Sequence, residues 1–161
     1  MNRLLLVIDV QSNFINEYTE DLIEKINDLI DSKQFDYVAF TQYKNALDGL
    51  FCRELGYLGC IKSEDQKLML DTRDFPVFEK SIYTAYNLEF KNYLLENHID
   101  QIYLCGIDTD ACVFKTALDL FEGEYDVYVL EDFCRSHIGE DAHNHAITTM
   151  RRLIGEKRVI S

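Results

Sequence analysis

Three residues with different chemical properties follow apolar segments of this sequence, and together they could form a reactive site. Asp9 comes directly after one apolar segment, Lys80 ends the stretch VFEK, and Cys112 lies in the loop GIDTDACV. Each alone has an ordinary explanation: such an Asp often caps a helix, a lone Lys is solvated, and a Cys packs as a small apolar residue. Their combination favours chemistry, because carboxylate, ammonium and thiol would leave neighbouring strands at one edge of a sheet.

The thiol of Cys112 has the surroundings expected of a nucleophile. It lies near the start of a predicted helix, behind Thr109 and Asp110, either of which could cap that helix. We expect the helix N-terminus and the Lys80 ammonium to lower the pKa of the thiol from about 8.5. Asp9 would balance Lys80 and carry protons to and from the thiol and the leaving group. Backbone N–H groups of the loop could stabilise an oxyanion, so the set is equipped for acyl transfer.

Short apolar segments alternate with segments of helical periodicity along the whole chain. An unbroken apolar segment such as Leu4–Ile8 is typical of a strand that is covered on both faces. We predict strands over 4–8, 36–40, 76–78, 101–105, 126–130 and 158–160, helices over 18–29, 86–97, 112–121 and 142–153, and a short helix opened by a capping signal at 63–66. This alternation implies right-handed crossovers and a parallel sheet with helices on both sides. Small ligands bind beyond the carboxyl ends of such strands, where Asp9, Lys80 and Cys112 would lie.

Length and composition bound the class of protein. The 161 residues, 47% of them hydrophobic, fit one compact domain over 1–161 without a linker. The formal net charge of −13 repels phosphate backbones and anionic lipids, so nucleic acid and membrane surfaces are disfavoured as partners. No apolar run approaches the roughly 20 residues that cross a bilayer, and no signal peptide is evident. We therefore expect a cytoplasmic protein whose five cysteines are free thiols.

Three motifs occur in the order and at the spacing found in one enzyme family. The motif DVQ-x-x-F spans 9–14, K-x-x-Y-T-A-Y spans 80–86, and G-x-x-T-x-x-C-V spans 106–113. With these motifs the sequence resembles the isochorismatase-like cysteine hydrolases, which include nicotinamidases, over nearly its whole length. The resemblance implies a three-layer α/β/α Rossmann-like sandwich with a six-stranded, mostly parallel sheet. It also implies a homodimer or homotetramer.

The resemblance further implies a role for each residue of the triad. Cys112 would be the nucleophile, Asp9 the general acid and base, and Lys80 the residue that tunes both. A cis peptide bond between Ile107 and Asp108 would direct the backbone N–H groups of Asp108 and Cys112 into an oxyanion hole. The implied reaction is hydrolysis of the C–N bond of a small amide or ureido compound through a thioester.

The sequence departs from the family pattern in its metal site and in its oxyanion loop. Nicotinamidase-like members carry an Asp-x-His motif after the second strand, whereas Phe40–Asn45 contains no His here. We therefore expect no metal and no cofactor, and structural or surface positions for the four histidines, His98, His137, His143 and His145. Asp108 stands where a small apolar residue is common. If its carboxylate faces the thiolate, it would raise the pKa of Cys112.

Residues around the three motifs are candidates for the substrate pocket. Gln11, Phe14, Tyr83 and Tyr86 would contact the substrate, with core packing as the alternative for the aromatic residues. The irregular segment Asn45–Cys60 is rich in apolar residues. It could form a lid over the pocket or a contact between subunits.

These observations leave one leading hypothesis and three alternatives. The leading hypothesis is an amidase-type cysteine hydrolase that acts on a small-molecule substrate. The first alternative is a catalytically silent binding or scaffold protein, and the second is a vinyl ether hydrolase of the isochorismatase type, which Cys112 disfavours. The third, a flavodoxin-like nucleotide or phosphate binder, lacks the glycine-rich loop that cradles phosphate.

Overall fold

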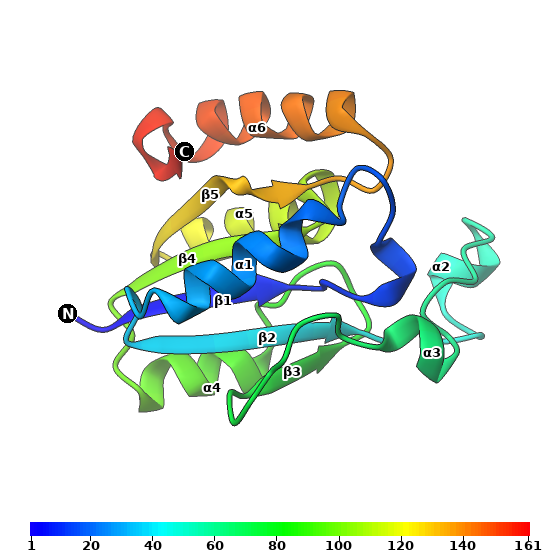
Figure 1. Ribbon diagram of the computed structural model, residues 1–161, viewed down its shortest axis with the longest axis horizontal. Coiled ribbons are helices and arrows are strands. Elements are labelled where there is room, and N and C mark those ends of the chain that lie inside the picture. The colour runs from blue at the N-terminus through cyan, green and yellow to red at the C-terminus, as the bar shows by residue number, and fades with distance from the viewer.

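Six parallel strands with helices on both faces make up the computed structural model, which describes all residues 1–161 (Figure 1). The strands are β1 (Arg3–Ile8), β2 (Tyr37–Tyr43), β3 (Val77–Lys80), β4 (Gln101–Ile107), β5 (Asp126–Arg135) and β6 (Val159–Ile160). The α-helices are α1 (Asp21–Asp31), α2 (Leu50–Arg53), α3 (Ser63–Gln66), α4 (Leu88–Glu96), α5 (Phe114–Glu122) and α6 (Glu140–Ile154). The strand order is β3-β2-β1-β4-β5-β6, with every neighbouring pair parallel. The predicted α/β/α Rossmann-like sandwich is confirmed.

Strand β1 is buried on both faces, as its unbroken apolar sequence predicts. On one face Leu5 packs in an apolar cluster with Leu22 and Ile26 of α1. On the other face Leu4 and Leu6 pack in a second cluster, which contains the apolar faces of α4, α5 and α6. Each of these fully buried leucines contributes roughly 1.5–3 kcal/mol of burial free energy. The two clusters hold the central strand rigidly, and with it the residue that follows.

The strand order places the expected chemistry at a topological switch point. β1 lies between β2 and β4, so the chain builds one half of the sheet before it crosses to the other. In open parallel sheets, ligands bind beyond the carboxyl ends of the strands at such a point. Asp9 follows β1, Lys80 ends β3, and Cys112 follows β4, all at this end of the sheet.

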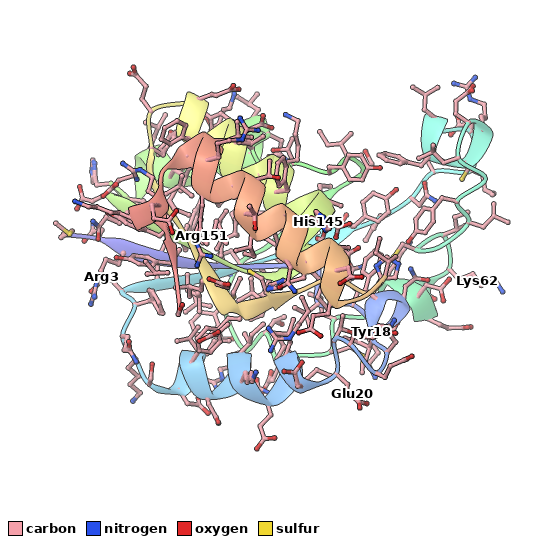
Figure 2. All side chains as sticks on the ribbon, turned by 90° about the horizontal axis from the view of Figure 1, so that it is seen from above. Arg3, Tyr18, Glu20, Lys62, His145 and Arg151 are labelled. Atoms are coloured by element: carbon pink, nitrogen blue, oxygen red, sulfur yellow. The ribbon has the colours of Figure 1, made fainter.

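The segment from 44 to 76 leaves the sheet and carries the short helices α2 and α3. The part with α2 and α3 extends beyond the carboxyl ends of the strands, at the right of Figure 1, and the chain then returns along the sheet to the start of β3. In the view from above, Lys62 of this segment and Arg3 at the start of β1 lie at opposite ends of the molecule (Figure 2). The segment is thus placed beside the candidate site. No helix in the structure is both long enough and apolar enough to span a membrane.

Three elements differ from their predicted form. β5 continues to Arg135, five residues beyond the predicted end, because a register shift between Leu104 and Gly106 of β4 allows pairing to resume at Cys134. The helix predicted from Cys112 begins as a π-helical turn, Thr109–Val113, which runs into α5. The capping signal at Ser63 is not used, since Lys62 precedes α3 and no side chain caps it.

Candidate active site

Asp9 is fully buried at the end of β1, where the chain turns. Its φ of 49° lies in the left-handed region, which Asp tolerates better than most residues. The backbone N–H of Asp9 donates to the Thr41 hydroxyl at 3.2 Å, and this hydroxyl donates to Oδ1 of Asp9 at 2.6 Å. Gly106 on β4 permits the close approach of the two strands, because a Cβ there would lie 2.1 Å from the Ile8 carbonyl oxygen.

Lys80 ends β3 with its side chain almost completely buried, at 1% exposed. Its Nζ donates to Oδ2 of Asp9 at 2.6 Å, to the carbonyl oxygen of Ile82 at 3.0 Å and to Sγ of Cys112 at 3.4 Å. An ammonium has three N–H groups, so all of its donors are used. The structure therefore brings the predicted carboxylate, ammonium and thiol into one contact group, although they are far apart in the sequence.

Cys112 lies in the π-helical turn, buried but reaching the wall of a pocket. The turn is anchored by Thr109, whose hydroxyl contacts Nδ1 of His143 on α6 at 2.7 Å. The peptide bond between Ile107 and Asp108 is cis, as the family resemblance implies. His143 is thus structural, as predicted, and it fixes the loop that presents the thiol.

The protonation of the triad differs from our expectation. Burial and the neighbouring Asp9 carboxylate raise the pKa of the Cys112 thiol well above its ordinary value, and Lys80 only partly opposes them. Although burial alone would favour the neutral amine, the charge of Asp9 holds the pKa of Lys80 above its usual value. We expected the helix N-terminus and the Lys80 ammonium to lower the pKa of this thiol. That expectation is wrong because the ammonium is already neutralised by Asp9, so a thiolate would add an uncompensated buried charge.

This arrangement can move one proton without changing its net charge. With Asp9 ionised, Lys80 charged and Cys112 neutral, the group carries no net charge. Transfer of the thiol proton to the Asp9 carboxylate produces a thiolate beside the ammonium and again leaves no net charge. The site is therefore suited to forming its nucleophile only when an electrophile arrives to share the charge.

A pocket of about 330 Å³ opens over Cys112 and is largely apolar. It is lined by twelve residues: Phe14, Tyr43, Phe51, Leu55, Tyr57, Tyr83, Asp108, Asp110, Ala111, Cys112, His137 and Ile138. The rings of Phe51 and Tyr83 meet edge-to-face with centroids 4.9 Å apart. Since Phe51, Leu55 and Tyr57 belong to the segment 45–60, that segment forms one wall of the pocket. Another hollow of about 360 Å³, beside α1 and the start of α6, is polar and contains no triad residue.

Comparison with known proteins now assigns the family. The family model described as an isochorismatase domain matches residues 3–157. The chain belongs to the isochorismatase family. The chain is 32% identical over 134 residues to isochorismatase family protein 2A of Dictyostelium discoideum, covering 80% of this chain and 64% of that relative. It thus spans somewhat less than two thirds of the length of that relative.

Solved structures of similar fold cover the chain more fully. An isochorismatase-like hydrolase from Alkaliphilus metalliredigens superposes with a TM-score of 0.86 at 22% identity, over 100% of this chain and 95% of that one. A pyrazinamidase of Pyrococcus horikoshii, solved in complex with zinc, gives a TM-score of 0.83 at 20% identity, over 99% and 98% of the two chains. At these identities the likeness demonstrates a common fold.

Two of the residues predicted to contact substrate lie elsewhere in this isochorismatase-family protein. Gln11 is fully buried and its amide bonds to the backbone of Tyr43, accepting from the N–H at 2.8 Å and donating to the carbonyl at 2.9 Å. Tyr86 packs edge-to-face on Tyr125, and its hydroxyl lies against Gly123 beyond the end of α5. Neither residue lines the pocket over Cys112, because the Gln11 amide is hydrogen-bonded to backbone and the Tyr86 ring packs on Tyr125. Phe14 and Tyr83 do line the pocket.

Asp108 lines the pocket, but its carboxylate is already hydrogen-bonded within the protein. It accepts from the backbone N–H of His137 at 2.8 Å and contacts Nδ1 of that ring at 2.6 Å. This hydrogen bond to Asp108 raises the pKa of His137, against the opposing effect of burial. His137 therefore belongs to the pocket wall, where it anchors Asp108. Asp108 is not among the main causes that raise the pKa of Cys112.

The Asp-x-His motif of nicotinamidase-like members has no equivalent set of side chains here. No group of three or more His, Cys, Asp or Glu side chains is arranged to hold a metal ion. Where the family motif would supply its ligands, Tyr43 lines the pocket, and the side-chain amide of Asn45 donates to the carbonyls of Tyr57 and Gly59. These residues do not fit a metal site, and no chemistry is assigned to one.

Sequence reasoning missed three side chains at the site. Thr41 and Tyr43 lie at the carboxyl end of β2, and His137 follows β5. The rule that identified the triad also applies to them, since all three lie at or just beyond strand ends. It could not identify His137 while β5 was predicted to end at Leu130.

Proposed function

We propose that this isochorismatase-family protein is a cysteine hydrolase that cleaves the C–N bond of a small amide or ureido compound through a thioester on Cys112. The observation that supports the proposal most directly is the Lys80 ammonium, which contacts both the Asp9 carboxylate and the Cys112 sulfur. A buried ion pair is costly to form, and here it contacts the thiol that lines this pocket. The pyrazinamidase fold neighbour, whose name denotes an amide hydrolase, supports the same reaction class.

The first half of the proposed reaction forms the thioester. As Sγ of Cys112 attacks the carbonyl carbon, its proton passes to Asp9 and the carbonyl electron pair moves onto oxygen. The backbone N–H groups of Asp108 and Cys112 are proposed to stabilise the oxyanion. When the tetrahedral intermediate collapses, the C–N bond breaks and the nitrogen leaves with the proton from Asp9. Lys80 stabilises the thiolate charge and holds Asp9 in place throughout.

The second half releases the acid. A water molecule gives one proton to Asp9 and attacks the thioester carbon. Collapse of this intermediate breaks the C–S bond, and the departing sulfur recovers the proton from Asp9. The net reaction consumes one amide and one water and yields an acid and ammonia or an amine. The triad returns to its neutral-thiol state.

Two measurements on the wild type test this proposal. Incubation with a panel of small aromatic and ureido amides should release ammonia, and intact-protein mass spectrometry after rapid quenching should find an acyl adduct on Cys112. Cys112→Ser should remove turnover and adduct together, whereas Cys134→Ala, a buried thiol outside the pocket, should retain both. If no panel member is hydrolysed and Cys112 carries no adduct, the silent binding protein becomes the better explanation.

Vinyl ether hydrolysis remains the second candidate chemistry. This reaction does not require the thiol. It would be identified by hydrolysis of an enol ether that the Cys112→Ser variant still catalyses and the Asp9→Asn variant does not. The position of Cys112, with its sulfur hydrogen-bonded to Lys80 beside the pocket, favours the amide reaction.

A further inference from the structure

His137 is held from three directions at the wall of the pocket. Its backbone N–H donates to Oδ1 of Asp108 at 2.8 Å, and its ring Nδ1 lies 2.6 Å from Oδ2 of the same carboxylate. Its carbonyl oxygen accepts from the side-chain amide of Asn16 at 2.7 Å, and its ring packs on Phe14 with centroids 5.5 Å apart. The imidazole therefore has a fixed position relative to Asp108.

Asp108 connects this histidine to the nucleophile. Its carbonyl oxygen accepts from the backbone N–H groups of Ala111 and Val113, which closes the π-helical turn that contains Cys112. Its side chain is only 11% exposed and is bound to His137. The main chain and the side chain of one residue thus join the turn of the nucleophile to the segment that follows β5.

The carboxylate of Asp108 would oppose the proposed reaction if its charge were not compensated. The backbone N–H of Asp108 is one of the two groups proposed to stabilise the oxyanion, and the carboxylate belongs to the same residue. A negative charge so close to the oxyanion would repel it, most strongly where little water is present to screen the two charges. Asp110 adds a second carboxylate to the same pocket. A positive charge at this wall would therefore favour formation of the oxyanion.

His137 is the only one of the twelve residues lining the pocket that can carry a positive charge. The Lys80 ammonium is already paired with Asp9. The hydrogen bond to Asp108 raises the pKa of His137, although burial opposes this effect. A protonated ring donates through Nδ1 to the carboxylate, so that the pair has no net charge. When the ring loses its proton, the negative charge of Asp108 is no longer compensated.

The other charged groups around this ring do not replace it. From the π-helical turn the ring meets only carboxylates, those of Asp108 and Asp110. The two residues that contact it from the loop after β1 carry no charge. Arg135, at the end of β5, pairs with Asp21 on α1, and Glu140 at the start of α6 lines the separate polar hollow. The charge at this wall of the pocket is therefore set by the protonation of one imidazole.

We propose that His137 is a positioning residue of the amide hydrolase, whose imidazolium compensates the Asp108 carboxylate and so allows the oxyanion hole to hold negative charge. This inference rests on the hydrolase function proposed above. Loss of the ring proton should lower kcat by about 10–100-fold, the effect of one uncompensated charge near the oxyanion. We expect kcat to fall to a lower plateau as the pH rises through the pKa of His137. Burial raises the pKa values of Cys112 and Tyr43, so these groups titrate at higher pH.

Substitution of both members of the pair tests the proposal, with kcat measured from pH 6 to 9 by ammonia release from the best substrate of the amide panel. His137→Asn keeps an N–H near the position of Nδ1 but carries no charge. Its kcat should be about 10–100-fold below that of the wild type at pH 6 and should no longer fall as the pH rises. The double variant with Asp108→Asn also lacks the carboxylate, so its kcat should exceed that of His137→Asn about tenfold or more. A histidine that only fixes the loop would not be rescued in this way.

Two further measurements keep the test independent of folding and of turnover. Thermal melting verifies that each variant is folded, and His145→Asn on the exposed face of α6 is the control that should keep the wild-type pH profile. Carbonyl-labelled benzaldehyde probes the site without turnover, because addition of the Cys112 sulfur to its carbon places the aldehyde oxygen where the oxyanion is proposed to form. The Kd of this adduct, followed by carbon NMR at pH 6, should increase at least about threefold in His137→Asn. The added Asp108→Asn substitution should reverse that increase.

The outcomes separate this inference from the function on which it rests. Turnover with the same pH profile in the wild type and in His137→Asn, or a double variant no more active than His137→Asn, would overturn the role of His137 and preserve the hydrolase. An adduct that weakens and recovers as expected, without hydrolysis of any amide, would support the role and overturn the hydrolase. Absence of both adduct and turnover would overturn both. If His137→Asn does not fold, Asp108→Asn alone decides, because its kcat should not fall between pH 6 and 9.

Discussion

The Thr41 hydroxyl donates a 2.6 Å hydrogen bond to Oδ1 of Asp9, while the other oxygen of that carboxylate accepts from Lys80. Both oxygens are thus satisfied inside the protein, and the carboxylate has one orientation. Thr41 lies at the end of β2, opposite Ile8 in the register of β1 and β2. The pairing of β1 with β2 therefore sets the position of the Asp9 carboxylate, which is the group proposed to transfer protons.

Replacing Thr41 with Val should disturb the site through this hydrogen bond. Val has nearly the same shape, so the main loss is the hydroxyl, which leaves a buried Asp9 oxygen without a donor. We expect the free energy of unfolding to fall by about 1–3 kcal/mol and turnover to fall with it. Urea denaturation and kcat measure the two effects. Thr148→Val is the control, since that hydroxyl is exposed on α6 and bonds only within its helix; equal effects in the two variants would contradict the assigned role.

Labelling of Cys112 with iodoacetamide should report the neutral resting thiol. Because burial and Asp9 raise the pKa of this thiol, the labelling rate in the wild type should stay low at pH 7 and increase only at alkaline pH. Asp9→Asn removes a charge that raises the pKa and leaves Lys80 uncompensated, so labelling should become faster at pH 7 even though catalysis is lost. Lys80→Met should slow labelling at every pH. Rapid labelling of the wild type at pH 6 would disprove the neutral resting state.

The contact between His137 and Asp108 should make stability depend on pH. Since the hydrogen bond to Asp108 raises the pKa of His137 in the folded state, its stabilising effect is complete below the unfolded value of about 6.5. It is lost as the pH rises through the folded value. The melting temperature of His137→Gln should therefore fall below that of the wild type more at pH 5.5 than at pH 9. His145→Gln, on the exposed face of α6 (Figure 2), should show no such dependence.

A pair of glycine substitutions should measure the close approach of β1 and β4. Gly106 and Gly155 have similar positive φ angles, 122° and 106°, so Ala is strained by the backbone at both. Only at Gly106 would the new Cβ also meet a neighbour, the Ile8 carbonyl oxygen at 2.1 Å, while nothing lies within 4 Å at Gly155. Gly106→Ala should lower the free energy of unfolding by at least about 2 kcal/mol more than Gly155→Ala. Equal losses in chemical denaturation would mean that the strands can separate without penalty.

The sequence by itself determined the layers of the fold and the three residues of the triad. Apolar segments such as Leu4–Ile8 alternate with amphipathic helical segments, and this pattern permits little but a parallel sheet covered on both faces. In such a sheet the residues after the strands share one edge, so Asp9, Lys80 and Cys112 could be grouped without coordinates. The motifs around them were sufficient to indicate the family, which the comparisons established.

Only the tertiary structure decided what surrounds these residues. Whether Gln11 contacts substrate or backbone, and whether Tyr86 faces the pocket or α5, depends on packing between segments that are far apart in the sequence. The resting charge of Cys112 could not be read from its position before a helix, because it depends on burial and on how completely Asp9 neutralises Lys80. The buried atoms of Tyr43 and Asp110 that lack a hydrogen bond can likewise be identified only in the folded chain. Sequence periodicity reports which face of an element is buried, whereas hydrogen bonding and electrostatics depend on distances that only the folded chain sets.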